Sequence, residues 1–194
     1  MISYLEGMLI QKTPTEIIID VGGVGYAVHI SLSTYSGLDG LNVRTKIFTH
    51  MHVREDAMQL YGFATEEERD VFRLLISVSG IGPRSAQGIL SGMSAKELKK
   101  CIQEGNIAVL TTLQGVGRKT AERMVIELRD KLGKTEAMSP SMPQHGIRLE
   151  ALNALLSLGY TRSNAETALR AVLHESKDLP LEDLIKQALR HAAK

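Results

Sequence analysis

Two segments of the chain decide its fold, because they repeat one pattern at an offset of 35 residues. Residues 78–90 read VSGIGPRSAQGIL, and residues 113–125 read LQGVGRKTAERMV. In both, glycine, an aliphatic residue and a second glycine are followed by a basic residue two positions later and by alanine four positions later. An apolar stripe at helical spacing precedes each copy. The pattern predicts two hairpins, each made of two short helices joined by a glycine-containing turn.

Each predicted hairpin presents the first turn of its second helix to a ligand. The amides at a helix N-terminus and the positive end of the helix dipole attract anions, so a phosphate oxygen can bind there. Arg84 and Lys119 lie in these first turns and add positive charge. The arrangement is that of the helix-hairpin-helix motif, which binds the DNA backbone and does not read the bases.

A simple tight turn is the alternative interpretation of any single glycine–x–glycine segment before a helix. Two copies with the same spacing of glycine, alanine and basic residue favour ligand binding over that alternative. A nucleotide-binding loop is disfavoured, because neither copy has a third glycine at the required spacing. The chain also contains no P-loop sequence, so we expect no ATPase site in it.

The first 63 residues predict β-structure. The predicted strands carry β-branched runs or alternating apolar residues, with glycine-rich or charged turns between them. About five short strands fit a small barrel of the OB type, although sandwiches and other small barrels fit nearly as well. The predicted strands cover residues 1–10, 16–21, 26–30, 43–53 and 57–63.

The remainder of the chain predicts helices in two groups. Helical periodicity begins at Thr65 and ends near Gly133, and three further helices are predicted in the tail. Between the groups lies a segment rich in proline, serine and threonine, which predicts a flexible linker. We therefore expect an α+β multidomain protein. Its predicted parts are a barrel at 1–63, tandem hairpins at 64–133, a linker at 134–146 and a three-helix domain at 147–194.

Composition narrows the class of protein further. Lys plus Arg number 23 and Asp plus Glu number 22, so DNA contacts must depend on local placement of charge. The single Cys101 excludes a disulfide within the chain and a cysteine-rich zinc site, and His50 and His52 lack an evident third metal ligand. We expect no metal and no cofactor. No apolar run is long enough to span a bilayer and no signal peptide is evident, which predicts a cytoplasmic protein.

The chain resembles the RuvA family, the Holliday-junction-binding subunits of the bacterial branch-migration machine, in its order of barrel, tandem hairpins, linker and helical tail. The segments VREDA at 53–57, LYGF at 60–63 and LSGMS at 90–94 resemble that family as well as the hairpins do. The likeness covers residues 1–133 with specific motifs, and the tail in size, position and helical pattern. One departure is Arg84, where a lysine would serve equally as a phosphate charge.

The resemblance implies a non-catalytic subunit that binds four-way DNA junctions without regard to sequence, in recombination and repair. It implies a homotetramer, with one or two tetramers on each junction. Residues 147–194 would bind the hexameric RuvB motor, which carries the ATPase, and the RuvC resolvase is a further candidate partner. Glu55 and Asp56 correspond to the family's acidic pin, which would repel phosphates at the crossover and help part the strands. The implied phosphate contacts are Ser79, Gly80, Gly82, Arg84, Gly115, Gly117, Arg118, Lys119, Thr120 and Arg123.

Two alternatives stay open from the residues. One is a general duplex-binding helix-hairpin-helix protein without junction preference, in which Glu55 and Asp56 form only a solvated hairpin tip. The other is a subunit of a DNA-repair nuclease or glycosylase. A glycosylase would need a catalytic aspartate after the hairpin, but Glu127 and Asp130 are spaced to pair with basic residues on their own helix. We therefore expect no catalytic residue.

Overall fold

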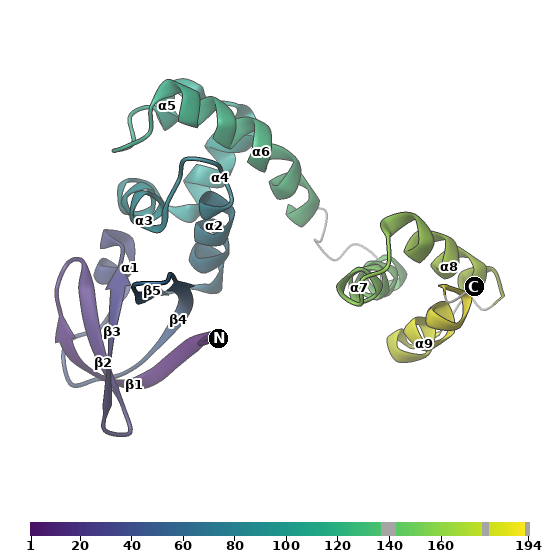
Figure 1. Ribbon diagram of the computed structural model, residues 1–194, viewed down its shortest axis with the longest axis horizontal. Coiled ribbons are helices and arrows are strands. Elements are labelled where there is room, and N and C mark those ends of the chain that lie inside the picture. Colours follow the sequence, from purple (N-terminus) through teal and green to yellow (C-terminus); the bar gives the residue numbers. More distant parts are fainter. Residues whose placement is uncertain (137–142, 176–178, 193–194) are drawn as a thin grey trace. The chain divides into compact units, whose positions relative to one another are not determined.

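The computed structural model describes residues 1–136, 143–175 and 179–192. The chain divides into two compact units, Met1–Thr135 and Glu136–Lys194 (Figure 1). In the first unit a β-barrel is followed by helices, and the second unit is helical. The predicted α+β class, with an OB-type barrel, tandem hairpins and helical tail, is confirmed. Within the described residues, no helix is both long and apolar enough to cross a membrane.

Five strands close the barrel in the order β1-β2-β3-β5-β4. Neighbouring strands are antiparallel except β3 and β5, which are parallel. The interior holds aliphatic side chains from alternate strand positions, as the sequence pattern predicts: Leu5, Leu9, Ile17, Ile19, Val28, Ile30 and Ile47. The strands are β1 (Tyr4–Lys12), β2 (Glu16–Val21), β3 (Val24–Ile30), β4 (Arg44–Val53) and β5 (Met58–Phe63).

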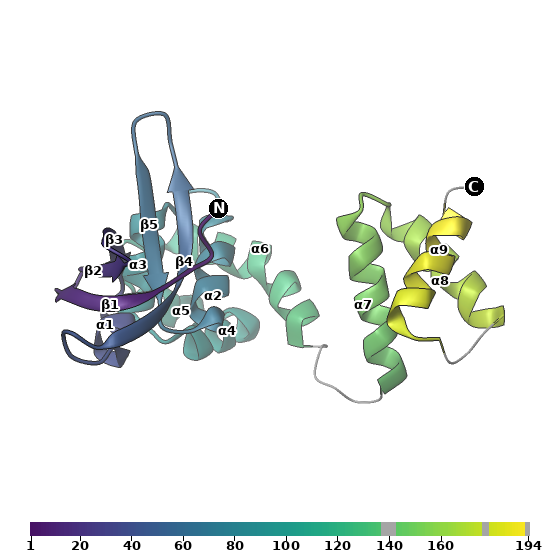
Figure 2. The ribbon, with the colours of Figure 1, turned by 90° about the horizontal axis from the view of Figure 1, so that it is seen from below.

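Strands β4 and β5 form a long hairpin whose register runs from Phe48 opposite Phe63 to Val53 opposite Met58. The turn is closed by the Arg54 N–H, which donates to the Ala57 carbonyl at 2.8 Å. Figure 2 shows this hairpin extending away from the rest of the barrel. The turn between the two strands therefore forms an exposed tip.

A short helix, α1 (Leu32–Gly37), lies between β3 and β4 and was not predicted from the sequence. Its N-cap, Ser31, accepts a hydrogen bond from the Thr34 N–H at 3.0 Å. Both Ser31 and Thr34 are buried, and their hydroxyls donate to the carboxylate of Glu68, at 2.7 Å and 2.9 Å. Glu68 therefore joins the barrel to the helix that follows it.

The helices of the first unit share one core, and that core includes Tyr61 and Phe63 from strand β5. Because two barrel residues are part of the helical core, barrel and hairpins form one compact unit. The helices are α2 (Glu66–Ile76), α3 (Pro83–Gly92), α4 (Ala95–Glu104), α5 (Ile107–Leu110) and α6 (Arg118–Glu136).

Three helices of the second unit cover a small core of alanine, leucine and valine side chains. They are α7 (Pro143–Ser157), α8 (Arg162–Glu175) and α9 (Leu181–Ala192). Helix α6 ends at Glu136 and α7 begins at Pro143, so both ends of the predicted linker are helical. Residues 137–142 of that linker lie outside the described residues.

Candidate nucleic-acid interface

The two repeated segments form hairpins with the same internal hydrogen bonds, 35 residues apart. In each turn, the N–H of the aliphatic residue donates to a carbonyl three residues earlier, at 3.1 Å. In each second helix, the alanine N–H donates to the carbonyl of the second glycine, at 2.9 Å. The pairs are Ile81 to Val78 and Ala86 to Gly82 in the first hairpin, and Val116 to Leu113 and Ala121 to Gly117 in the second.

The aliphatic residue of each turn points inward. Ile81 and Val116 are each 5% exposed and belong to the shared helical core. Ala86 and Ala121 are fully buried, so each second helix packs closely against its neighbours. The buried aliphatic and alanine side chains therefore anchor each turn to the helical core, and the glycines of the turn are exposed.

The two glycines of each turn differ in backbone conformation. Gly80 has φ +93° and Gly115 has φ +79°, a left-handed conformation that side chains disfavour. Gly82 and Gly117 do not have a positive φ, and a Cβ added to either would meet no atom within 4 Å. The fold itself does not require glycine at the second position. The open space there suits a ligand that approaches the backbone closely.

The second helix of the first hairpin starts with free amides. Gly82 is its N-cap and supplies no side-chain hydrogen bond, and Pro83 in the first turn has no N–H. The next two residues, Arg84 and Ser85, are exposed. No hydrogen bond to their amides is formed within the residues that the structure describes. In the second hairpin, α6 begins at Arg118 directly after Gly117.

The predicted basic residues fall into two groups by their contacts. Arg84 and Lys119 are exposed, and neither joins an ion pair within the described part of the chain. Arg118 pairs with Glu122 at 3.1 Å on the surface of α6. The Arg123 Nη1 donates to the Ser79 carbonyl at 3.5 Å.

The Arg123–Ser79 contact brings together two of the predicted phosphate contacts, one from each hairpin. Lys131 adds a second link, because its Nζ donates to the Ser77 hydroxyl at 3.0 Å. Helix α6 is thus fastened to the turn of the first hairpin. The predicted contact residues Gly80, Gly82, Gly115 and Gly117 are all exposed, and Thr120 is half-buried.

Glu55 and Asp56 lie at the tip of the β4–β5 hairpin, and both are exposed. Among the described residues, neither carboxylate forms an ion pair. The base of the same hairpin packs on α2: the ring of Phe72 lies 5.3 Å from that of Tyr61 and 4.8 Å from that of Phe63, centroid to centroid. The acidic tip is therefore carried by a hairpin anchored to α2, the first helix of the first helical hairpin.

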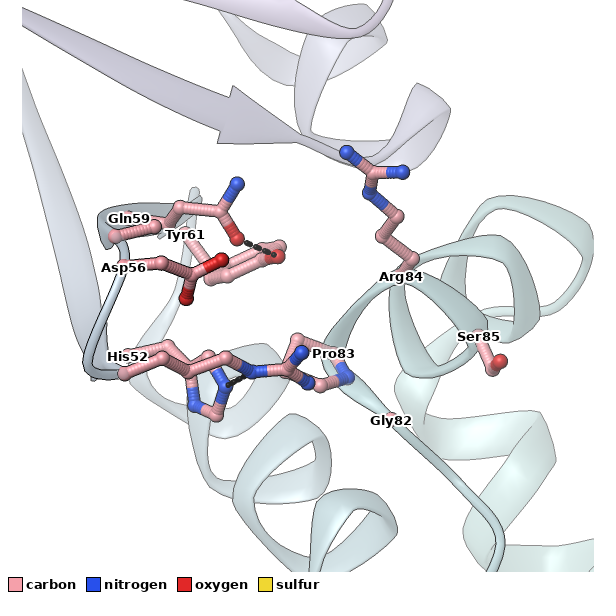
Figure 3. A pocket seen from close by; sticks show the side chains of 10 residues that line it. His52, Asp56, Gln59, Tyr61, Gly82, Pro83, Arg84 and Ser85 are labelled. Carbon is pink, nitrogen blue, oxygen red and sulfur yellow. Dashed lines mark hydrogen bonds between the residues drawn. The ribbon is translucent and has the colours of Figure 1, made fainter.

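A pocket of about 340 Å³ separates the β4–β5 hairpin from the start of α3. Figure 3 shows His52, Asp56 and Gln59 on one side and Gly82, Pro83 and Arg84 on the other. Arg54 also lines it, and its Nε donates to the His52 Nε2 at 3.0 Å. The full lining is His52, Arg54, Asp56, Ala57, Gln59, Tyr61, Gly82, Pro83, Arg84 and Ser85.

Sequence reasoning missed this pocket and the place of Arg54 in it. The only hint in the sequence was that Arg54 directly precedes the acidic pair. The opposite wall of the pocket is formed by Gly82 and its neighbours, which begin 28 residues later in the chain. Burial raises the pKa of Tyr61, and the positive charges of Arg84 and Arg54 oppose that rise. Both guanidinium groups therefore act on the same hydroxyl.

His50 and His52 both lie on strand β4. Within the described residues, no group of three or more His, Cys, Asp or Glu side chains could hold a metal ion. His50 packs on Phe72 with 5.5 Å between ring centroids. Burial lowers the pKa of His50, and the nearby positive charge of Arg73 lowers it further.

Comparison with known proteins assigns the chain to a family. Three family models match it: the RuvA N terminal domain over residues 1–62, the SAM-like Helix-hairpin-helix tandem over 72–130, and the RuvA C-terminal domain over 147–193. The chain belongs to the RuvA family. The match to the family's C-terminal domain gives the tail a specific relationship that its sequence pattern alone did not.

Several curated relatives are similar over their whole length. The chain is 47% identical to a protein of Syntrophotalea carbinolica and 48% identical to one of Chloroherpeton thalassium, with 98% of each chain covered in both cases. It is 41% identical to a protein of Alkalilimnicola ehrlichii over the full length of both. Each of these relatives is a Holliday junction branch migration complex subunit RuvA.

Proposed function

We propose that this chain binds four-way DNA junctions through the DNA backbone and serves as the non-catalytic DNA-binding subunit of a branch-migration complex. The observation that carries the proposal is the pair of hairpin turns with matching hydrogen bonds, each with an exposed second glycine and a basic residue in the following helix. Membership of the RuvA family supports it, and the names of the relatives give the same activity.

Both hairpins are suited to hold one duplex arm. A phosphate oxygen at each turn would accept hydrogen bonds from the helix N-terminal amides, which favour an anion. Arg84 and Lys119, which join no ion pair among the described residues, add one positive charge to each site. Since these contacts involve no base edge, every sequence would be held alike, which migration of a junction requires.

Glu55 and Asp56 would act where the strands exchange. Neither carboxylate is neutralised by an ion pair among the described residues, so each protomer presents two negative charges at the tip of a projecting hairpin. In a four-fold assembly these tips would gather at the crossover. Each like-charge contact with a phosphate at a partly screened site costs about 1 kcal/mol. Such a cost is enough to bias a near-balanced exchange of base pairs.

The second unit would bind the motor. Its three helices cover their own core, and the exposed large apolar side chains among its described residues are Leu156 and Leu158, which lie near the end of α7. Leu158 is 60% exposed, whereas Tyr160, Leu173 and Leu179 pack against the core. We propose that a RuvB-type ATPase binds this unit, that the assembled subunit is a tetramer, and that RuvC is a further partner.

A gel-shift competition between a four-way junction and a linear duplex of the same sequence tests the proposal. The wild type should prefer the junction by at least about tenfold. Changing Glu55→Gln together with Asp56→Gln should preserve duplex binding and reduce that preference. The matched control is Glu182→Gln with Asp183→Gln, which removes an identical exposed acidic pair from α9.

The outcomes separate the two parts of the proposal. Equal affinity of the wild type for junction and duplex would show a general duplex binder instead. An unchanged preference in the Glu55, Asp56 double variant, with the control also unchanged, would remove the role of the acidic pair while leaving junction binding intact.

A further inference from the structure

The pocket between the β4–β5 hairpin and α3 has a guanidinium group on each wall. Arg54 comes from the hairpin and Arg84 from the first turn of α3. Within the part of the chain that the structure describes, neither arginine joins an ion pair. Two like charges that face one pocket repel each other, so the arrangement favours an anion between them.

A hydrogen bond to His52 orients the Arg54 guanidinium. Its Nε donates to the His52 Nε2, an interaction that requires the unprotonated nitrogen of a neutral imidazole. The bond occupies Nε and leaves both terminal nitrogens of the guanidinium to donate. A planar guanidinium with two such nitrogens matches the geometry of a phosphate.

The rest of the lining also favours a phosphodiester over a cation. The Tyr61 hydroxyl donates to the Gln59 Oε1 at 3.0 Å, which leaves the Gln59 amide group as a donor. Asp56 is the one acidic residue of the lining. The volume of about 340 Å³ is at the lower end of the range for small-ligand pockets, about 300–1,000 Å³, and therefore suits a nucleotide unit and not a duplex.

We propose that this pocket holds one phosphodiester of a DNA strand beside the crossover, with Arg54 on one wall and Arg84 on the other. The inference rests on the proposed junction binding and adds Arg54 as a residue that distinguishes junctions from duplexes. On this proposal Arg54 attracts DNA phosphates, whereas the next two residues, Glu55 and Asp56, repel them. Arg54 holds the strand at the side of the hairpin, while Glu55 and Asp56 at its tip repel the phosphates that meet there.

One wall of the pocket is the first hairpin turn, which we assign to a duplex arm, and the other is the projecting β4–β5 hairpin, which carries Arg54. The two helix-hairpin-helix turns supply the contacts to an arm, whereas Arg54 belongs to the projecting hairpin of the barrel. Arg84 would contact this phosphate in any bound arm, whereas Arg54 would reach it only where the strand turns away from its arm beside the hairpin tip. Loss of Arg54 should therefore weaken junction binding and leave duplex binding unchanged.

The test uses the full chain with Arg54→Gln, and with Arg44→Gln as the matched control. Arg44 lies at the opposite end of β4 and pairs with Glu6 at 3.0 Å, so its replacement removes the same charge away from the pocket. At about 0.1 M salt, Arg54→Gln should lower junction affinity about tenfold and reduce the salt slope by about 0.9 for each phosphate that is no longer neutralised. Lys119→Ala, which changes a hairpin, should weaken junction and duplex alike.

Junctions with a single neutral methylphosphonate linkage locate the contact. We expect one linkage close to the crossover to cost the wild type about tenfold and the Arg54→Gln variant less than about twofold, while neutral linkages in the arms cost both proteins equally. Equal losses for both proteins at every position would overturn the inference, as would a parallel loss of duplex affinity in Arg54→Gln. A wild type without junction preference would instead refute the proposed function itself.

Discussion

The second glycines of the two hairpins allow binding to be separated from folding. We consider the double change Gly82→Ala and Gly117→Ala. Neither position has a positive φ, and an added methyl group would meet no atom of the protein within 4 Å. If a phosphate approaches the backbone at these positions, the methyl groups would occupy the space that the phosphate needs.

The structure gives a magnitude for each effect. Alanine is a poorer N-cap than glycine, so Gly82→Ala should lower the free energy of unfolding by about 1 kcal/mol or less. On the DNA side, a displaced phosphate would lose two amide hydrogen bonds to a charged acceptor, each contributing about 1.5 kcal/mol or more. A loss of about 3 kcal/mol at one hairpin corresponds to an affinity about 100-fold lower.

The assay measures both quantities on the same proteins. Fluorescence anisotropy with a labelled duplex gives the affinity, and urea denaturation gives the free energy of unfolding. Gly88→Ala is the matched control, because Gly88 lies inside α3 and its added Cβ would also meet nothing within 4 Å. Alanine inside a helix is favoured over glycine by about 1 kcal/mol, so this variant should be more stable and bind DNA normally.

One result would refute the reasoning. If the Gly82, Gly117 double variant is folded and binds duplex DNA within about twofold of the wild type, no phosphate lies against these turns. The helix N-termini would then not be the DNA contacts, and the basic side chains would have to act elsewhere.

Two further predictions concern the connection between barrel and hairpins. Glu68→Gln should lower the free energy of unfolding by about 1–3 kcal/mol, because the two buried hydroxyls donate to different carboxylate oxygens and an amide NH2 group in place of one oxygen cannot accept. Glu67→Gln, which breaks an exposed pair with Lys99, should cost about 1 kcal/mol or less in urea denaturation. The lowered pKa of His50 means that the unfolded chain binds the proton more readily. The contribution of neutral His50 to the free energy of unfolding should be complete above the ordinary histidine pKa of about 6.5 and should fall as the pH drops below it. The urea midpoint should therefore be lower at about pH 5.5 than at about pH 7.5, and His50→Gln should make the two midpoints more nearly equal.

The hairpins could be predicted from sequence because their determinants are local. The glycines that need a left-handed backbone, the inward aliphatic residue and the closely packed alanine all lie within nine residues of one another in each copy. The repeat at a fixed offset then favoured a binding motif over a simple tight turn. Barrel strands were likewise visible as alternating or β-branched runs, since one face of each strand packs on the barrel core.

Contacts between distant segments could not be predicted in the same way. Thr65 and Glu68 have the spacing of a capping box, and the Thr65 hydroxyl does accept from the Glu68 N–H at 3.1 Å. The Glu68 carboxylate, however, accepts hydrogen bonds from Ser31 and Thr34 and from the Ala64 N–H, so it does not complete the box. A buried carboxylate takes the donors that tertiary packing brings to it, and α1, which supplies two of them, has no strong periodic signal.

The same packing bears on how the acidic tip is used. A tip that repels phosphates can part strands only if it stays in place under the load of the DNA, so its support must be stiff. The base of the hairpin packs on Phe72 through Tyr61 and Phe63, all three nearly or fully buried. Glu68, one turn earlier on α2, fastens the same helix to the barrel. Because α2 is also the first helix of the first hairpin, the tip and the turn that we propose for phosphate binding are positioned by one packed cluster. A change within this cluster should therefore alter junction preference and arm binding together, whereas a change at the tip alone should separate them.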